Sequence, residues 1–181
     1  MLIDAQQSAL LVIDVQEKLL PGVHQNEQLV NSCKWLMGVA KLMKIPTLGT
    51  EQYPRGVGPT TETLRELLPE EDFIAKTVFS CANSKDCSTR IDQLNRQQIV
   101  ICGMEAHVCV LQTALELKDQ GKDVFVVVDA ISARNPTDTE FAIRRMDKAG
   151  IHLVTREMVG FEWIRRSDAP EFKDFSIRFL Q

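Results

Sequence analysis

The sequence predicts one α/β domain, a doubly wound six-stranded parallel sheet with helices on both faces. The first observation is length, because 181 residues suit a single domain with a full hydrophobic core. The second is a series of short apolar runs, rich in Val and Ile, separated by longer amphipathic stretches. The third is the repeated alternation of these two patterns, which is typical of parallel strands joined by right-handed helical crossovers.

The apolar runs are the expected strands, because short and nearly continuous runs suit strands buried on both faces. They lie at residues 9–13, 45–48, 73–78, 99–102, 124–128 and 151–154. The amphipathic stretches are the expected helices, at residues 27–44, 61–68, 84–95, 107–120 and 137–149. Asn135 and Pro136 precede the last of them and Gly150 follows it, a start and stop signal. The apolar tail 171–181 is expected to pack on the sheet edge or on a neighbouring subunit.

Composition limits the partners. Apolar residues make up 44% and charged residues 25%, which is typical of globular proteins, and 21 Lys and Arg against 25 Asp and Glu give a net charge of −4. This balance provides no attraction to nucleic acid or to an anionic membrane, so a small-molecule substrate is expected. The sequence has no long apolar span and no basic leader, and we expect a cytoplasmic protein.

Cysteine and histidine usage argues against bound metals and disulfides. The five cysteines lie at positions 33, 81, 87, 102 and 109. They form no CxxC pair and are odd in number, so reduced thiols are expected. The three histidines are scattered without metal-ligand spacing, so no metal is expected. The sequence also lacks GxGxxG and GxxxxGK[ST] strings, which sets dinucleotide and P-loop functions aside.

In open α/β sheets the ligand binds at the carboxyl ends of the strands. Residues at these ends are therefore the candidates for chemistry: Asp14, 50–53, Lys76, 103–109 and Asp129. Asp129 is better explained as a helix cap.

Three of these residues have both a functional and a structural interpretation. Cys109 begins a helical segment, where the helix dipole favours a thiolate, although most cysteines are small core residues. Asp14 is either a general base or a turn cap. Lys76 lies inside an apolar run, so it either meets a buried carboxylate or reaches solvent from an edge strand. A dyad of Cys109 with His107 is disfavoured, because helical residues two apart point in different directions.

Several segments together resemble the isochorismatase-like cysteine hydrolase superfamily. They are LLVIDVQ, the third-run lysine in FIAKTVFS, and GMEAHVCVLQTAL. TEQYP and VVDAISARNP resemble its isochorismatase domain-containing branch. The match spans nearly the whole chain, so residues 1–181 are expected to form one isochorismatase-like hydrolase domain.

The resemblance implies a catalytic triad of Asp14, Lys76 and Cys109. Cys109 would attack a carbonyl carbon after giving its proton to Asp14, with Lys76 paired to Asp14. It also implies a cis peptide bond between Met104 and Glu105. The backbone N–H groups of Glu105 and Cys109 would then form an oxyanion hole.

Substrate contacts are implied at Glu51, Gln52, Tyr53 and Phe79, whose chemistry suggests a small polar group between aromatic walls. The retained Cys109 favours hydrolysis of a C–N bond through an acyl-enzyme. The absence of histidine from TEQYPRGVGPTTE argues against a metal and against a pyridine substrate.

The expected function is therefore cofactor-free hydrolysis of a small amide, ureido or related substrate by a homo-oligomer. The alternative is a catalytically quiet member that acts as an interaction or oligomer scaffold. A thiol redox sensor is a third possibility, for which Cys109 needs a resolving partner. A nuclease is disfavoured by the acidic charge.

Overall fold

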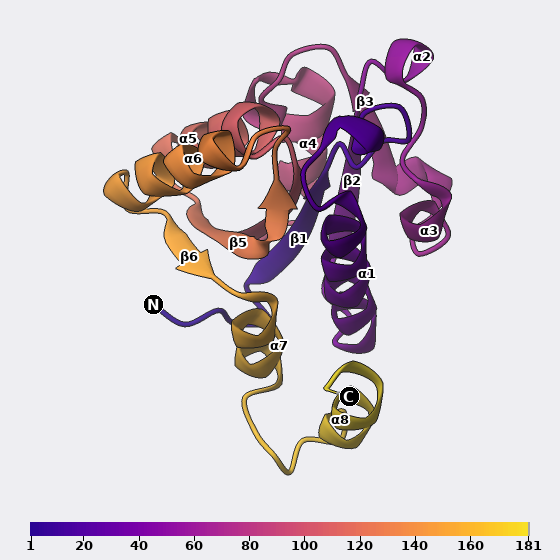
Figure 1. Ribbon diagram of the computed structural model, residues 1–181. Helices are drawn as coiled ribbons and strands as arrows, with labels where there is room; N and C mark the ends of the chain where they lie inside the picture. The colour runs from indigo at the N-terminus through magenta and orange to yellow at the C-terminus, as the bar shows by residue number, and fades with distance from the viewer. Residues whose placement is uncertain (181) are drawn as a thin grey trace.

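The computed structural model describes residues 1–180, and its centre is a six-stranded sheet (Figure 1). The strands are β1 (Ser8–Ile13), β2 (Thr47–Gln52), β3 (Phe73–Lys76), β4 (Gln98–Met104), β5 (Asp123–Ser132) and β6 (His152–Val154). All neighbouring pairs are parallel, in the order β3-β2-β1-β4-β5-β6. The predicted fold class is confirmed. The strand order reverses between β1 and β4, which is where such sheets bind ligands.

Helices cover both faces of the sheet. They are α1 (Asn26–Leu42), α2 (Pro54–Val57), α3 (Glu62–Arg65), α4 (Lys85–Gln93), α5 (Leu111–Asp119), α6 (Pro136–Lys148), α7 (Arg156–Ile164) and α8 (Phe172–Phe179). Short 3-10 turns lie at η1 (Leu20–Gly22), η2 (Glu70–Asp72) and η3 (Cys81–Asn83), and η4 (Ala106–Val110) is a π-helical turn.

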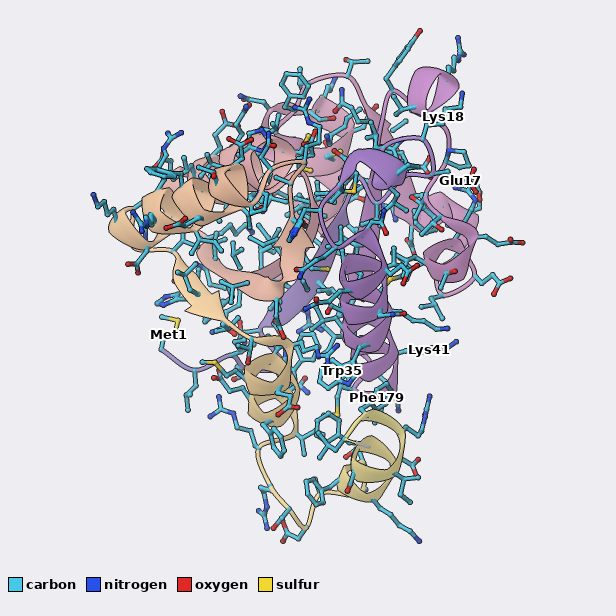
Figure 2. The ribbon with its side chains drawn as sticks, viewed as in Figure 1. Met1, Glu17, Lys18, Trp35, Lys41 and Phe179 are labelled. Atoms are coloured by element: carbon cyan, nitrogen blue, oxygen red, sulfur yellow. The ribbon has the colours of Figure 1, made fainter. Side chains whose placement is uncertain are left out.

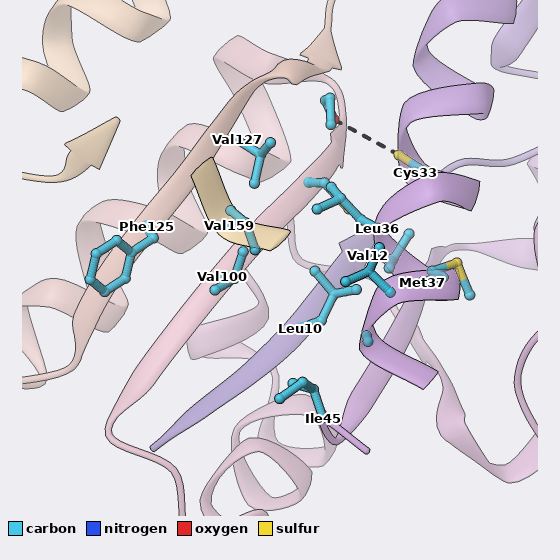
Figure 3. Packing of buried hydrophobic residues seen from close by; sticks show 14 of the residues in the cluster. Leu10, Val12, Cys33, Leu36, Met37, Ile45, Val100, Phe125, Val127 and Val159 are labelled. Carbon is cyan, nitrogen blue, oxygen red and sulfur yellow. Dashed lines mark hydrogen bonds between the residues drawn. The ribbon is translucent and has the colours of Figure 1, made fainter. Parts of the chain in front are cut away.

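Alternation along the strands divides the core into two layers. In β1, Leu10 and Val12 face a core shared with α1, α7 and α8, whereas Leu11 and Ile13 face the core under α4, α5 and α6. Figure 3 shows the first layer, with Leu10 and Val12 against Leu36 of α1. Burial on both faces explains why the strand sequence is continuously apolar.

Some element boundaries differ from prediction. The helix expected at 61–68 is only α3, although Leu67 and Leu68 also pack against the core that contains Leu64. Pro69 follows them, and a residue that precedes proline disfavours the helical conformation. The strand expected at 73–78 ends at Lys76, and Val78 is exposed. β5 runs on to Ser132, because it pairs again with β4 after a register shift.

The apolar tail forms α8 and does not pack on the sheet edge. Phe175 is fully buried in the core with α1 and α7. Trp35 of α1 meets the rings of Phe175 and Phe179 edge-on at 5.9 and 5.7 Å, and its indole N–H donates to the Phe179 carbonyl (Figure 2). Aromatic burial of this kind anchors the last helix to the domain. In the described residues, no helix has the length and apolar character of a membrane span.

Candidate active site

The candidate site lies at the carboxyl ends of β1, β2, β3 and β4. Asp14 follows β1 in a tight left-handed turn, with a φ of 51°. Its N–H donates to the carbonyl of Thr50 at 3.1 Å, and its own carbonyl accepts from the N–H of Gln16 at 2.8 Å. Aspartate tolerates this backbone region better than most residues do. The turn directs the Asp14 side chain across the strand ends instead of along β1.

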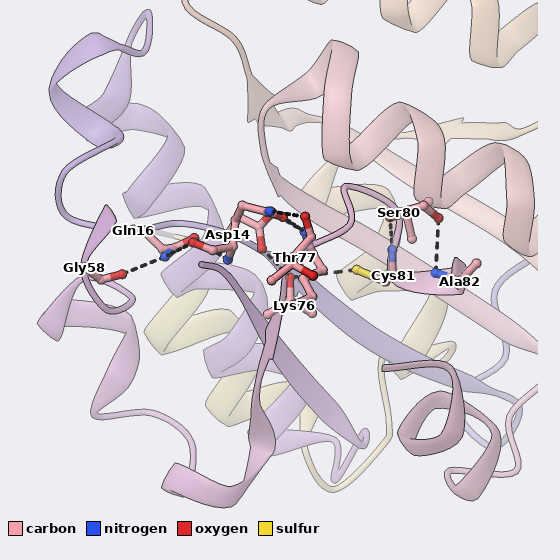
Figure 4. A network of polar contacts seen from close by, with 11 residues as sticks. Asp14, Gln16, Gly58, Lys76, Thr77, Ser80, Cys81 and Ala82 are labelled. Carbon is pink, nitrogen blue, oxygen red and sulfur yellow. Dashed lines mark hydrogen bonds and ion pairs between the residues drawn. The ribbon is translucent and has the colours of Figure 1, made fainter. Parts of the chain in front are cut away.

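Asp14 and Lys76 form a buried ion pair. Lys76 Nζ donates to Asp14 Oδ2 at 2.7 Å, and the two residues are 4% and 1% exposed. Thr50 Oγ1 donates to Asp14 Oδ1 at 2.7 Å, and Lys76 Nζ also donates to Gln52 Oε1 at 2.8 Å. Figure 4 shows Asp14 and Lys76 meeting inside this network. Buried charges persist when they are paired and hydrogen-bonded, so the partner expected for Lys76 is Asp14.

A glycine sets the approach of β4 to β1 beside this pair. Gly103 has a φ of +115°, and a Cβ there would lie 2.2 Å from the carbonyl oxygen of Ile13. Any side chain would push the two strands apart. Gly103 therefore fixes how closely the segment after β4 approaches Asp14.

Cys109 belongs to that segment. It lies in the π-helical turn η4, directly before α5, and is 6% exposed. Its side chain and Asp14 line the same cavity. The peptide bond between Met104 and Glu105 is cis, as the resemblance implies. The structure thus brings together the three residues of the proposed triad from β1, β3 and the start of α5.

Burial of Cys109 and the charge of Asp14 together raise the pKa of the thiol to about 12, against the opposing effect of Lys76. A pKa in this range favours the protonated thiol near neutral pH. This direction of the pKa shift is opposite to the lowering that a helix start favours, and it agrees with the other interpretation of Cys109, a small buried residue. Burial lowers the pKa of Lys76, but Asp14, Cys81 and Cys109 together hold it above its ordinary value. The lysine stays charged.

The structure places two of the four predicted substrate contacts at the cavity beside Cys109 and two elsewhere. Gln52 and Phe79 line the cavity beside Cys109. The carboxylate of Glu51 instead accepts hydrogen bonds from Arg65 Nη1 and from the N–H of Thr60, each at 2.7 Å. Tyr53 lines a different cleft, of about 560 Å³, whose lining also includes Lys76 and Thr77. Glu51 and Tyr53 are thus not at this cavity.

Sequence reasoning missed several partners of the site. The hydroxyl of Thr50 was not assigned to Asp14, although the pairing of Ile13 with Thr50 places it there. Arg134 Nε donates to Glu105 Oε2 at 2.9 Å, an ion pair between distant loops that no local pattern reveals. His107 lies 3.8 Å from the carboxylate of Asp138.

No metal centre is evident in the part of the chain that the structure describes. Across residues 1–180, no group of three or more His, Cys, Asp or Glu side chains is arranged to hold an ion. The polar groups at the site are a thiol, a carboxylate and the lysine ammonium that pairs with this carboxylate.

The order of the strands defines the class of protein as a doubly wound α/β domain. Its site contains a thiol and a buried Asp–Lys pair, at the point where the strand order reverses. The Isochorismatase domain model matches residues 8–158, and the chain belongs to the isochorismatase family. It is similar to isochorismatase domain-containing protein 2 of Danio rerio, with 36% identity over 169 residues, 92% of this chain and 84% of that protein.

Two solved structures are similar over most of the chain. One is described as MAR1 ribonuclease from Caenorhabditis elegans, with 37% identity, a TM-score of 0.93, and coverage of 100% of this chain and 93% of that chain. The other is the YcaC gene product from Escherichia coli, described as an octameric hydrolase of unknown specificity, with 29% identity, a TM-score of 0.88, and coverage of 92% and 84%. Membership of the family supports a hydrolase function.

Proposed function

We propose that this protein is a cysteine hydrolase that cleaves a C–N bond in a small amide, ureido or related substrate. The observation that carries the proposal is the buried Lys76–Asp14 pair, 2.7 Å between Nζ and Oδ2, in one site with the thiol of Cys109. A carboxylate paired with a lysine, in one site with a thiol, has the composition of a general base with its nucleophile.

The proposed reaction has two stages. Asp14 accepts the thiol proton as the sulfur of Cys109 attacks the carbonyl carbon, and the oxyanion accepts hydrogen bonds from the backbone N–H groups of Glu105 and Cys109. Collapse breaks the C–N bond, and the leaving nitrogen takes the proton from Asp14. Asp14 then deprotonates a water that attacks the thioester, which releases the acid and returns the proton to the thiol. Lys76 pairs with Asp14 and holds its carboxylate in position for these transfers. The route needs no cofactor.

The raised pKa of Cys109 supports this sequence of steps. With a pKa of about 12, the thiol delivers its proton only when Asp14 accepts it during attack. A base 2.7 Å from a buried ammonium is held in place for that transfer. Proton transfer by a positioned base contributes about 10²–10⁴-fold to rate.

The test is a panel of small primary amides, with ammonia release and the intact mass of the protein as readouts. We expect at least one amide to release ammonia and to add its acyl mass to Cys109. Cys109→Ala and Asp14→Asn should abolish both signals, whereas Cys33→Ala, on the opposite face of the sheet, should retain them. Turnover that survives Cys109→Ala refutes the mechanism. A thiol that no electrophile modifies in the folded protein favours the quiet scaffold instead.

Ribonuclease activity is the second candidate, because a structural relative with 37% identity is described as a ribonuclease. The net charge of −4 and the carboxylates of Asp14 and Glu105 at the cavity oppose binding of a polyanion. Incubation with an end-labelled RNA separates the two candidates. Cleavage lost in Cys109→Ala would assign the site to RNA and overturn the amide proposal.

We also propose that the protein is a homo-oligomer. The E. coli relative is described as octameric, and the surface here exposes the large apolar side chains of Phe141 and Phe161. Light scattering with size-exclusion chromatography should give a mass of two or more times the 20.4 kDa of one chain. A monomer at micromolar concentration would contradict this.

A further inference from the structure

The cavity beside Cys109 is small and mostly apolar. Its volume is about 130 Å³. The apolar side chains in its lining include Leu19, Val57, Phe79, Met104 and Val108. A protein cavity of about 150 Å³ holds a benzene-sized molecule, so this one accommodates about six carbon atoms. Its size therefore limits the group that can be attached to the reacting carbonyl.

Two protein partners hold the side-chain amide of Gln52. Its Oε1 accepts from Lys76 and its Nε2 donates to the carbonyl of Thr77, each at 2.8 Å. One N–H and one lone pair of the amide stay free for a ligand, and they are uncharged. Glu51, the other residue that suggested a polar group, is held by Arg65 and Thr60 and does not line this cavity.

The charges at the cavity are acidic. Asp14 lines it with Lys76 behind it, and Glu105 lines it with Arg134 as its partner. The Arg134 side chain is 63% exposed, against 19% for Glu105, so the arginine lies on the solvent side of that pair. Among the described residues that line the cavity, none is a lysine or arginine. A carboxylate entering this space would face two carboxylates and no cation at the wall.

We propose that the acyl half of the substrate is an uncharged apolar group of up to about six carbon atoms, and that anionic acyl groups are rejected by Asp14 and Glu105. This inference rests on the proposed function, because it assumes that Cys109 is the acylated nucleophile. It narrows the substrate to amides of short aliphatic or small aromatic acids.

The test uses p-nitrophenyl esters as acyl donors and follows acylation of Cys109 by site-resolved mass spectrometry. Two donors form a matched pair, 4-methylpentanoyl and succinyl, because a terminal isopropyl group has nearly the shape of a carboxylate. We expect 4-methylpentanoyl transfer to be at least about tenfold faster, since the carboxylate of succinyl gains no cationic partner in the cavity. An acetyl donor should also react, whereas a decanoyl donor exceeds the cavity and should react slowest.

Glu105→Gln tests the origin of the charge selectivity. The substitution removes one carboxylate and leaves the backbone N–H in place. It should bring the succinyl rate closer to the 4-methylpentanoyl rate, by about threefold or more. Glu62→Gln is the matched control, because Glu62 is an exposed residue of α3 that does not line the cavity. It should leave the ratio of the two rates unchanged.

The outcomes distinguish the two proposals. The acyl-group inference is overturned if the succinyl donor acylates Cys109 as fast as the 4-methylpentanoyl donor, or if the decanoyl donor is the fastest. Either result leaves the assignment of Cys109 as the nucleophile standing. Acylation of Cys109 by none of the donors overturns the proposed function, and the inference with it. If Glu62→Gln shifts the ratio of the two rates as much as Glu105→Gln does, the carboxylate of Glu105 is not the cause of the charge selectivity.

Discussion

Asp14→Asn should make Cys109 more reactive toward a simple alkylating agent while it stops hydrolysis. In the wild type, burial and the charge of Asp14 hold the pKa of Cys109 at about 12 against an ordinary value of 9.0. Asparagine removes the negative charge and leaves the Lys76 ammonium beside the sulfur. The thiol pKa should therefore fall, whereas the general base needed for turnover is lost.

The upper limit of the effect follows from a return of the pKa to its ordinary value of 9.0. At pH 8 the thiolate fraction would rise from about one in ten thousand to about one in ten, a gain of about 1,000-fold. A thiolate of lower pKa is a weaker nucleophile, and the Brønsted slope of about 0.5 reduces the gain by about 30-fold. The net acceleration is therefore at most about 30-fold.

The assay is the rate of iodoacetamide addition at each of the five cysteines, measured by mass spectrometry on folded protein at a series of pH values. Cys109 in Asp14→Asn should react faster than in the wild type and with a lower apparent pKa, while the other cysteines keep their rates. Lys76→Met should change Cys109 in the opposite direction, because it removes the charge that lowers the thiol pKa. A Cys109 that reacts more slowly in Asp14→Asn, or at an unchanged rate, would refute the electrostatic argument.

Other predictions concern stability. Thr50→Val should cost about 1.5–3 kcal/mol in the free energy of unfolding, because it removes a hydrogen bond to a charged group. Thr50→Ser keeps the hydroxyl and should retain most of that free energy. Equal losses of stability in the two variants, measured by urea melts, would contradict this. Gly103→Ala should cost more than about 3 kcal/mol, since its Cβ would meet the Ile13 carbonyl at 2.2 Å; a near-neutral thermal melt would show that β4 shifts freely. The raised pKa of Cys109 contributes stability that is complete below pH 9.0 and lost as pH rises toward about 12, so Cys109→Ala should show a shallower alkaline decline in urea melts than the wild type. Phe175→Ala should cost about 3–5 kcal/mol and lower the thermal midpoint, and a smaller loss would mean that α8 contributes little to the core.

The sheet was predictable mainly from β1, β4 and most of β5, which are buried on both faces and therefore read as continuous apolar runs. The boundaries that failed depend on tertiary contacts. β5 continues to Ser132 only because it pairs again with β4 beyond the register shift. The tail becomes α8 only because Trp35 and the α1 surface give Phe175 a place to pack. Neither contact has a local sequence signature.

The site was predictable where chemistry is unusual for its position. A lysine in an apolar strand requires a partner, and Asp14 at the end of β1 provides it. Thr50 has no unusual feature in the sequence, and its role depends on the pairing of β2 with β1. For Cys109 the sequence leaves a helix-start thiolate and a buried core residue both open, because the helix start is visible in the sequence and the burial that raises the thiol pKa is not.

The burial and raised pKa of the Cys109 thiol have a consequence for damage by oxidants. Peroxides attack thiolates, so a 6% exposed thiol with a pKa of about 12 should form sulfenic acid slowly in the resting protein. A redox sensor requires the reverse, an accessible thiol of low pKa. In the proposed mechanism the sulfur is already bonded to the acyl carbon while Asp14 holds its proton, so no step exposes a free thiolate to a peroxide for long.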